Sequence, residues 1–496
     1  DRSPSRGLGD VYKRQDCYRA KVGSFASVNP MGRGVQWTCT MEVGIRVFNL
    51  LSSYELLRCG LCEDDPMHTV IAELAFCHGE HIWANLETSA RLQENNHYIA
   101  DLLGLAAVVA AYPNLPKARK WGEYTHNELM RCVRKQVLDD GCCFERSTRY
   151  TRLMGEMLFF AGKCFAETPY KLPAEYFERL SILGRFLDAV TNKDGRSLQV
   201  GDNDSGRVVC ISPERYDDLR LVSRLVDREI GPDAPDEAFF AEEELFYGAS
   251  GRVACFPSWR GGARTFYDAG MALARYGDWS LGFFASDGFV DESEPGHTHN
   301  DKLSFTLGFK GVPFFVDPGS GVYTRDPKVR NILRGTAQHS TLRFGNLEQN
   351  EFRGLFGYTR CGGASLDVAE ADGTVVFRGA TDCWATRLGV THKRVVEVGS
   401  EGVAVKDDVE GAAPAVAATR SFVLAPEVDV SVVGRKEAVL TCRGVSVVFC
   451  AESDISVREG LYSPHYGAVI KSSILDVPFE YGRTNVITVR EILNED

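Results

Sequence analysis

Apolar residues in the first half of the chain recur with the spacing of helices. In the segment MEVGIRVFNLLSSYELL (41–57) they return every three or four positions, and the segments 98–112, 152–167 and 176–190 repeat this period. That spacing puts the apolar side chains on one face of an α-helix. Short stretches with Pro, Gly, Asp and Asn separate the segments, as expected of loops. The pattern predicts stacked helical hairpins between about residues 35 and 245.

The pattern changes after about residue 250 to short runs rich in Val, Phe and Thr, with glycine-containing turns between them. These runs predict strands, and they occupy residues 302–317, 374–379, 393–411, 427–434, 438–451 and 485–493. No convincing helix is predicted beyond about residue 340. The chain thus divides into an all-α domain (16–245) and an antiparallel β domain (250–496), joined near 240–260. Because no low-complexity linker separates them, we expect the domains to pack together around a groove, the default place for a site.

Composition narrows the class of protein. The length of 496 residues suits two or three domains, and the net charge of −12 argues against a nucleic-acid binder, which normally shows a basic face. The longest apolar run, 102–112, is too short to span a membrane. Fifteen cysteines without framework spacing argue against a disulfide scaffold. The one CxxC pair, Cys59 and Cys62, reads as incidental, with a redox or metal role as the alternative.

Residues 1–15 are set apart from the fold. The stretch SPSRGLGDVYKRQ (3–15) resembles a recurrent artefact of assembled sequencing reads, in which an adapter has been translated. We therefore expect residues 1–15 to be foreign to the protein and the natural N-terminus to be missing. On this expectation the lack of a leader peptide carries no information about export.

Polar side chains surround the apolar run 302–317. His299 stands before it, Asp317 ends it, and His339 follows in TAQHST. The spacings of eighteen and twenty-two residues suit three neighbouring strands or strand ends, and two imidazoles with a carboxylate form a typical zinc set. Spacing alone leaves the alternative that each side chain caps a turn, for which Asp317-Pro-Gly is a good signal.

The segment before this run carries further polar groups. If it is extended, His297 and Asp301 point to the same side as His299. One of the two imidazoles would then face a ligand while the other holds a metal. Asp301 would orient an imidazole from behind.

Three further motifs precede the strand-rich half. Asn95, Asn96 and His97 open an apolar helix, and an N-cap explains one Asn but not the pair followed by His. Tyr150 stands at the start of another helix, where a buried tyrosine is more often part of the core. The run GDNDSGR (201–207) is polar and glycine-rich, and alone it reads as a solvated turn.

In their order along the chain, these motifs resemble those of the heparinase II/III group of polysaccharide lyases. The resemblance rests on NPMGRGVQW, MEVGIRVFNLL, ENNHYIADLLGL, DGCCFERSTRYTRLMGE, GDNDSGR, GHTHNDKLSFTLGFKGVPFFVDPGSGVYT and RNILRGTAQHSTLRFGN, and it covers roughly residues 29 to 350. It implies an α+β multidomain fold, in which an N-terminal (α/α) toroid, an incomplete α/α barrel, is followed by a C-terminal antiparallel β-sandwich. Substrate would lie in the cleft between them.

The resemblance also implies a site and a substrate class. It assigns catalysis to Asn96, His97, Tyr150 and His297, and a metal, usually zinc, to His299, Asp317 and His339. Members act on uronic-acid polysaccharides such as heparan sulfate, alginate or bacterial exopolysaccharides. The expected partner is therefore an anionic polysaccharide, and the expected location is periplasmic or secreted, with the cytoplasm left open by the cysteine content. Departures from the common pattern at Asp101, Thr151 and Gln338–Ser340 leave the exact substrate open.

A uronate linked at C4 can be cleaved without water, by removal of the C5 proton and departure of the C4 oxygen. Asn96 and His97 would hydrogen-bond its carboxylate as negative charge builds. Tyr150 would take the C5 proton as phenolate or protonate the leaving oxygen as phenol. Its pKa of about 10 must fall for the first role, for which Arg152 or His297 would supply a cation. His297 is the alternative base for the other C5 epimer.

The remaining assignments concern binding. Substrate contacts are expected from Arg152, Tyr323 and Arg334, with packing as the alternative for Tyr323. Because elimination needs no activated water, the Zn²⁺ is expected to be structural, with direct Lewis-acid help as the alternative.

Two other functions are weighed against the lyase. A glycoside hydrolase needs two carboxylic acids flanking the bond, and Asp101, Glu145 and Asp202 form no clear pair. A non-catalytic glycan-binding or capsule-assembly protein would be marked by loss of Tyr150 or His297, and both are present.

Overall fold

The computed structural model describes residues 4–88, 95–192, 197–210, 218–219, 222–223, 226, 261–287, 296–359 and 362–492. The chain forms two compact units. Unit 1 comprises Asp1–Gln136, Leu153–Leu180 and Arg207–Cys210, and unit 2 comprises Val137–Arg152, Ser181–Gly206 and Ile211–Asp496. The predicted junction near 240–260 lies outside the described residues.

Unit 1 is helical, as the apolar period predicts. Its elements are α1 (Pro4–Val28), η1 (Val35–Trp37), α2 (Thr40–Leu57), η2 (Arg58–Gly60), α3 (Pro66–Ala84), α4 (Asn96–Ala111) and α5 (Ala118–Gln136). Helices α6 (Thr148–Phe165) and α7 (Ala174–Ala189) have residues in both units. The four segments predicted from apolar spacing are confirmed as α2, α4, α6 and α7.

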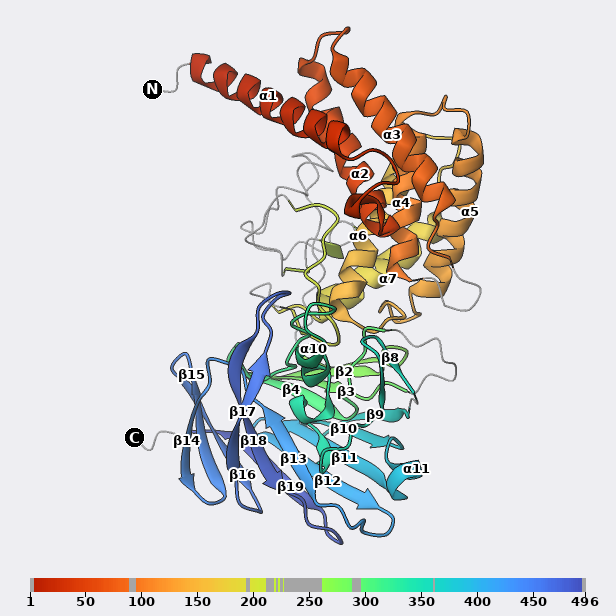
Figure 1. Cartoon of the computed structure of the whole chain (residues 1–496). Coiled ribbons are helices and arrows are strands. Elements are labelled where there is room, and N and C mark those ends of the chain that lie inside the picture. Colours follow the sequence, from red (N-terminus) through yellow and green to blue (C-terminus); the bar gives the residue numbers. More distant parts are fainter. Residues whose placement is uncertain are drawn as a thin grey trace. The chain divides into compact units, whose positions relative to one another are not determined.

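Two glycines let α2 and α4 approach closely, and the helices lie side by side in Figure 1. A Cβ on Gly44 would lie 2.2 Å from the carbonyl oxygen of Ala100, and one on Gly104 would lie 2.7 Å from Gly44 Cα. Nearly all of α4 between Tyr98 and Val109 is buried, which explains its almost continuous apolar sequence.

Unit 2 contains antiparallel sheets. A five-stranded sheet has the order β1 (Gly262–Phe266), β2 (Met271–Tyr276), β3 (Trp279–Phe284), β4 (Ser304–Phe309), β5 (Val312–Phe315). An eight-stranded sheet has the order β14 (Asp429–Gly434), β15 (Glu437–Cys442), β16 (Val445–Ala451), β19 (Asn485–Glu491), β12 (Gly402–Glu410), β11 (Thr391–Gly399), β10 (Thr374–Thr381), β9 (Ala364–Ala371). A four-stranded sheet has the order β17 (Ser456–Tyr462), β18 (Ile470–Pro478), β13 (Ala418–Val423), β6 (Leu342–Phe344), and β7 (Phe352–Arg353) pairs with β8 (Gly357–Tyr358).

One apolar cluster joins the three larger sheets. It includes Phe305 of β4, Phe377 of β10 and Phe422 of β13, none more than 1% exposed. Every second residue of β11 is buried, as a strand with one face on the core requires. The predicted antiparallel strands are therefore confirmed.

Short helices interrupt the strand-rich part. They are α10 (Pro327–Leu333), η4 (Thr336–Gln338) and α11 (Ala385–Leu388). The last is a single turn, so the expectation of no convincing helix beyond about residue 340 needs only this small correction. Among the described helices, none combines the length and apolar composition of a membrane span.

Candidate active site and metal centre

Three buried side chains of unit 2 meet near the ends of strands. His299 lies before β4, Asp317 follows β5, and His339 follows η4. One ligand atom of each lies within 4.8 Å of the other two, and no residue of the three is more than 4% exposed. The juxtaposition predicted from spacing is confirmed.

Hydrogen bonds on the outer side of these residues leave three inner atoms without a hydrogen bond, although two of them, His339 Nε2 and Asp317 Oδ2, lie 3.4 Å apart. His299 Nε2 donates to Asp202 Oδ1 (2.9 Å). His339 Nδ1 donates to a backbone carbonyl (2.8 Å), and Asp317 Oδ1 accepts from a backbone N–H (2.8 Å). His299 Nδ1, His339 Nε2 and Asp317 Oδ2 have no hydrogen-bond partner among the described residues. Because buried polar atoms are rarely left unpaired, these three atoms fit a bound cation.

The donor set fits zinc among the common cations. Two neutral imidazoles and a carboxylate match its ligand preference. Outer hydrogen bonds that fix the tautomer also accompany metal-binding histidines. A metal held here would tie together the segments before β4, after β5 and after η4.

Asp202 joins this centre to His297. Its Oδ1 accepts from His299 and its Oδ2 accepts from His297 Nδ1 (2.9 Å each), and Arg330 pairs with both oxygens. Burial would raise the pKa of Asp202, but Arg330 and the two histidines outweigh burial and lower it. The role of orienting an imidazole, expected of Asp301, is therefore filled by Asp202.

A glycine makes the approach of Asp202 possible. Gly201 has a φ of +68°, and a Cβ there would lie 2.6 Å from the carbonyl oxygen of His297. The backbone N–H of Asp202 donates to this same carbonyl (2.9 Å). The run 201–207, which alone reads as a solvated turn, is thus packed against the segment that carries His297.

Tyr150 lies against His297 within unit 2. The two rings stack with centroids 3.6 Å apart and an interplanar angle of 16°. Tyr150 Oη donates to Asp204 Oδ2 (2.9 Å) and lies 3.2 Å from Tyr323 Oη. The side-chain oxygen of Ser147 accepts from the backbone N–H of Tyr150 (3.2 Å) and so caps the start of α6. Tyr150, His297 and Tyr323 are therefore brought together.

The surroundings of Tyr150 favour the neutral phenol. Burial raises its pKa well above the ordinary value, and Tyr323 and the carboxylates of Asp204 and Asp202 raise it further. Burial raises the pKa of Tyr323 in the same way. The lowered pKa that a base role for Tyr150 would need is therefore not provided by these neighbours, and the base role stays a prediction.

Arg152 and Arg334 are enclosed in unit 2, with 1% and 0% of their surface exposed. Arg152 donates to the carbonyl of Gly206 (2.5 Å), and Arg334 donates to the carbonyl of Gly354 (2.6 Å) while its guanidinium lies 4.1 Å from the ring centre of Phe352. These contacts hold loops in place. Substrate binding by either arginine stays a prediction.

Asn96 and His97 begin α4 in unit 1. The side chain of Asn95 caps the helix by accepting from the backbone N–H of His97 (3.0 Å), so capping accounts for the first Asn. Asn96 is 1% exposed. His97 Nδ1 lies 2.5 Å from Glu87 Oε2. Burial alone would lower the pKa of His97, but hydrogen bonds to Cys39 and Glu87 raise it to about 10.

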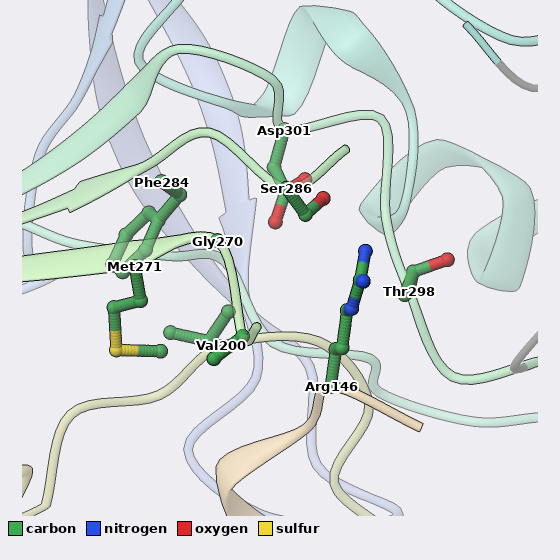
Figure 2. Close-up of a pocket in the computed structure, with 9 residues that line it drawn as sticks. Arg146, Val200, Gly270, Met271, Phe284, Ser286, Thr298 and Asp301 are labelled. Atoms are coloured by element: carbon green, nitrogen blue, oxygen red, sulfur yellow. The ribbon is translucent and has the colours of Figure 1, made fainter. Parts of the chain in front are cut away.

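A small pocket in unit 2 borders the segment of His297 (Figure 2). Its lining comprises Arg146, Val200, Ala269, Gly270, Met271, Phe284, Ser286, Thr298 and Asp301. Figure 2 shows the Arg146 guanidinium pointing into the space next to Asp301. Arg146 also forms an ion pair with Asp287 (2.5 Å). The pocket therefore adds a cationic group near the residue that follows His297, a group that the sequence did not single out.

Four partners of the predicted residues were not predicted from the sequence, namely Asp202, Asp204, Arg330 and Glu87. The first two lie in GDNDSGR, where the only signal was an unusually polar run. Arg330 opens the motif RNILRGTAQHSTLRFGN, where only Arg334 and His339 were predicted to act, and Glu87 stands in a segment without a motif. No local signal therefore marked either residue as a partner.

Two family models match the chain. Residues 13–187 match the model described as Heparinase II/III N-terminus, and residues 260–490 match Heparinase II/III-like, C-terminal. A curated heparin-sulfate lyase of Pedobacter heparinus is 23% identical over 349 residues, which are 68% of this chain and 49% of that protein. The chain thus aligns with about half the length of this relative.

Several solved structures share the fold. A crystal structure of heparinase III has a TM-score of 0.72 at 18% identity, over 98% of this chain and 74% of the other. Heparan sulfate lyase HepC of Pedobacter heparinus gives 0.65 at 18% identity, over 98% and 72%. A chondroitin AC lyase of Streptomyces coelicolor A3 gives 0.60 at 11% identity, over 98% and 72%. With a helical first part and a sheet-rich second part, each matched by its own family model, the chain belongs to the heparinase II/III-like family.

Proposed function

We propose that this protein is a polysaccharide lyase that cleaves a uronic-acid-containing polysaccharide by β-elimination. The observation that carries the proposal is the contact between Tyr150 and His297. Their rings stack at 3.6 Å, and the Tyr150 hydroxyl is bonded to Asp204. Two groups that can move a proton therefore lie against each other, which suits a reaction made of one proton abstraction and one proton donation.

In this reaction the C5–H and C4–O bonds break and a C4–C5 double bond forms. The C5 proton goes to a base, and the departing oxygen receives a proton from an acid. Because its surroundings raise the pKa of Tyr150, the phenol is the form present before substrate binds, which favours Tyr150 as the acid. His297 is then the base. Tyr150 becomes the base only if substrate displaces Asp204 or places a cation beside the phenol.

The carboxylate next to C5 must be neutralised as charge develops. Asn96 and His97 supply an amide and an imidazole for this role. One such preorganised donor is worth on the order of 3 kcal/mol of barrier. Their assignment rests on the family and stands apart from the geometry of unit 2.

The remaining features of the proposal are carried over from the heparinase II/III-like family. The helices would belong to an (α/α) toroid, and the sheets to a β-sandwich. His299, Asp317 and His339 would hold Zn²⁺ as a structural ion, which when bound would supply charge neutralisation at the strand ends. The substrate would be heparan sulfate or a related uronate polymer, met in a periplasmic or secreted location.

The test is absorbance of the C4–C5 double bond during incubation with a panel of uronate polysaccharides. Tyr150→Phe should lower turnover by about 10²–10⁴-fold. Tyr481→Phe is the matched control, because its hydroxyl makes one bond of the same kind, to the carbonyl of Val416 (2.9 Å). Full activity in Tyr150→Phe would remove the assigned role. New reducing ends without the absorbance would replace elimination by hydrolysis.

A further inference from the structure

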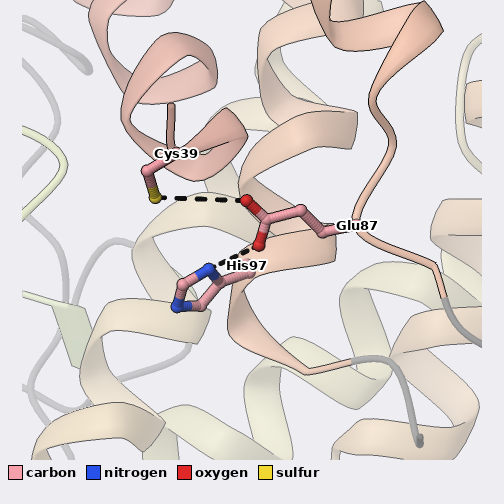
Figure 3. Close-up of side chains that lie close together, drawn as sticks. All are labelled: Cys39, Glu87 and His97. Atoms are coloured by element: carbon pink, nitrogen blue, oxygen red, sulfur yellow. Dashed lines mark hydrogen bonds and ion pairs between the residues drawn. The ribbon is translucent and has the colours of Figure 1, made fainter. Parts of the chain in front are cut away.

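Unit 1 holds a second group of metal-ligating side chains (Figure 3). Ligand atoms of Cys39, Glu87 and His97 all lie within 4.8 Å of one another. Cys39 Sγ is 4.0 Å from Glu87 Oε1, and His97 Nδ1 is 2.5 Å from Glu87 Oε2. Figure 3 shows the thiol of Cys39 directed at one carboxylate oxygen of Glu87 and the imidazole of His97 at the other.

The fold fixes this group from three elements. Cys39 is the N-cap of α2, Glu87 follows α3, and His97 lies in the first turn of α4. Glu87 Oε1 also accepts from the backbone N–H groups of Thr40 (2.9 Å) and Met41 (3.4 Å). The carboxylate is therefore held by the backbone of α2 while both other ligand atoms face it.

The donor types select a class of cation. A thiolate with an imidazole is a soft set that zinc and neighbouring transition metals prefer, and calcium and magnesium do not. Zn–S of about 2.3 Å and Zn–N of about 2.0 Å place neighbouring donors of a tetrahedral site roughly 3.5 Å apart, so the observed separations need only small side-chain shifts. The His97 side chain is 39% exposed, which leaves a fourth position open to water.

A second acidic side chain lies behind Glu87. Asp101 is fully buried and accepts from the backbone N–H of Glu87 (2.7 Å). Its Oδ1 has no hydrogen-bond partner in the part of the chain that the structure describes. Burial raises the pKa of Asp101 to about 8, so this carboxyl adds little negative charge at neutral pH and the case for a cation rests on the three donors themselves.

We propose that Cys39, Glu87 and His97 form a second metal site, which takes a divalent transition-metal ion of the zinc class. Binding displaces the thiol proton of Cys39 and the Nδ1 proton of His97, and leaves one coordination position to water. The site is separate in its ligands from the His299, Asp317 and His339 centre.

Sulfur makes the two centres distinguishable by spectroscopy. The test uses metal-free protein carrying Cys59→Ser and Cys62→Ser, because this exposed pair is another possible thiolate site. Co²⁺ alone is the probe. The centre with two histidines and an aspartate has no sulfur ligand, so a thiolate-to-cobalt charge-transfer band in the near ultraviolet reports the Cys39 site. We expect that band, its loss in Cys39→Ser, and its retention in the control Cys17→Ser, which removes an exposed thiol of α1.

Substitutions of the other two ligands provide the second part of the test. Glu87→Gln and His97→Ala should each raise the Co²⁺ concentration at half-saturation at least tenfold. A band that persists in Cys39→Ser would overturn the proposal, as would no band at Co²⁺ concentrations that load the other centre.

A measurement without variants covers the case in which Cys39→Ser does not fold. Zn²⁺ should slow alkylation of Cys39 in the wild-type chain at least tenfold and leave Cys17 unaffected, as read by peptide mass spectrometry. Equal labelling of Cys39 with and without Zn²⁺ would overturn the proposal. Neither readout depends on lyase activity, so failure of the site and failure of the proposed reaction are distinguishable.

Discussion

In the described part of the chain, two groups of metal-ligating side chains combine histidine with a carboxylate, and they differ in their hydrogen bonds. In unit 2, His299 and His339 donate their N–H groups to partners outside the cluster. The inward-facing atoms make no hydrogen bond, and the nearest approach printed among them is 3.4 Å, between His339 Nε2 and Asp317 Oδ2. In unit 1, His97 points its Nδ1 inward at Glu87, 2.5 Å away. The first cluster is arranged for a cation, whereas the second is already bridged by a proton.

This difference predicts different behaviour toward metal. A site whose inner atoms are unpaired and buried gains stability from a cation without giving up a hydrogen bond. A half-exposed site that must release protons binds more weakly and exchanges with solvent. Metal at the unit 2 centre should therefore contribute to the stability of the fold. Metal at the unit 1 cluster should bind more weakly, to a unit that is already folded.

Of the three substitutions that compare the clusters, Asp317→Ala should have the largest effect on the free energy of unfolding. Removal of one of three ligands should abolish metal binding and lower the free energy of unfolding of unit 2 by about 4 kcal/mol, the value for a ligand present at 1,000 times its dissociation constant. Metal content by mass spectrometry and peptide-resolved hydrogen exchange measure both. The control Asp367→Ala removes an exposed carboxylate that pairs with Arg378 (3.1 Å), and should change stability by less than about 0.5 kcal/mol. Unchanged protection in metal-free Asp317→Ala would show that the centre is not structural.

Asp202→Asn should have the second-largest effect on the free energy of unfolding. It touches no metal, yet it replaces a carboxylate that neutralises Arg330 and fixes the tautomer of His299. A buried arginine without its anion is destabilising by about 3 kcal/mol, and loss of an outer partner weakens metal binding roughly 10–100-fold. Zinc titration monitored by calorimetry tests the second effect.

Asp204→Asn is the matched control, because Asp204 bonds Tyr150 and makes no contact with either metal-ligand histidine in the described hydrogen bonds. It should keep the metal affinity of the parent. Equal loss in both variants would mean that the effect is general destabilisation of the 201–207 loop rather than orientation of His299.

The same two clusters show which site residues could be predicted from the sequence. His299 and Asp317 could be predicted because each stands at the end of a recognisable apolar run, with a ligand-type side chain at that point. Cys39 and Glu87 could not, because one is among fifteen cysteines and the other lies between helices. Their common neighbour is His97, which three-dimensional packing brings to them and no local pattern indicates.

The other partners in the site could not be predicted from the sequence for the same reason, because they are far apart along the chain. Asp202 and Arg330 are separated by 128 positions, and nothing in GDNDSGR says which histidine it meets. A base role for Tyr150 needs a cation beside its hydroxyl, for which the sequence offers Arg152 or His297, but the hydrogen-bond partners of that hydroxyl are Asp204 and Tyr323.

Periodicity explains what was predictable in the fold. The longer helices and strands carry enough residues for the 3.6- and 2-residue periods to stand out. The two-residue strands β7 and β8 and the single turn α11 do not. After β5 the chain also passes several times between the four-stranded and the eight-stranded sheet. This order is set by long-range strand pairing, which the local sequence pattern does not show.

Glu87→Gln should have the smallest effect of the three, and it is the sharpest test of the comparison. The amide keeps an oxygen for the backbone N–H groups of Thr40 and Met41 and loses only the charge opposite His97, which is partly exposed. Loss of such a bond should lower the stability of unit 1 by about 1 kcal/mol, read from hydrogen exchange at the starts of α2 and α4. Glu80→Gln, which removes the surface pair with Lys117 (2.6 Å), should change less than about 0.5 kcal/mol. A loss in Glu87→Gln as large as that in Asp317→Ala would mean that both clusters hold the fold together, and the distinction between a cation-ready centre and a proton-bridged one would no longer stand.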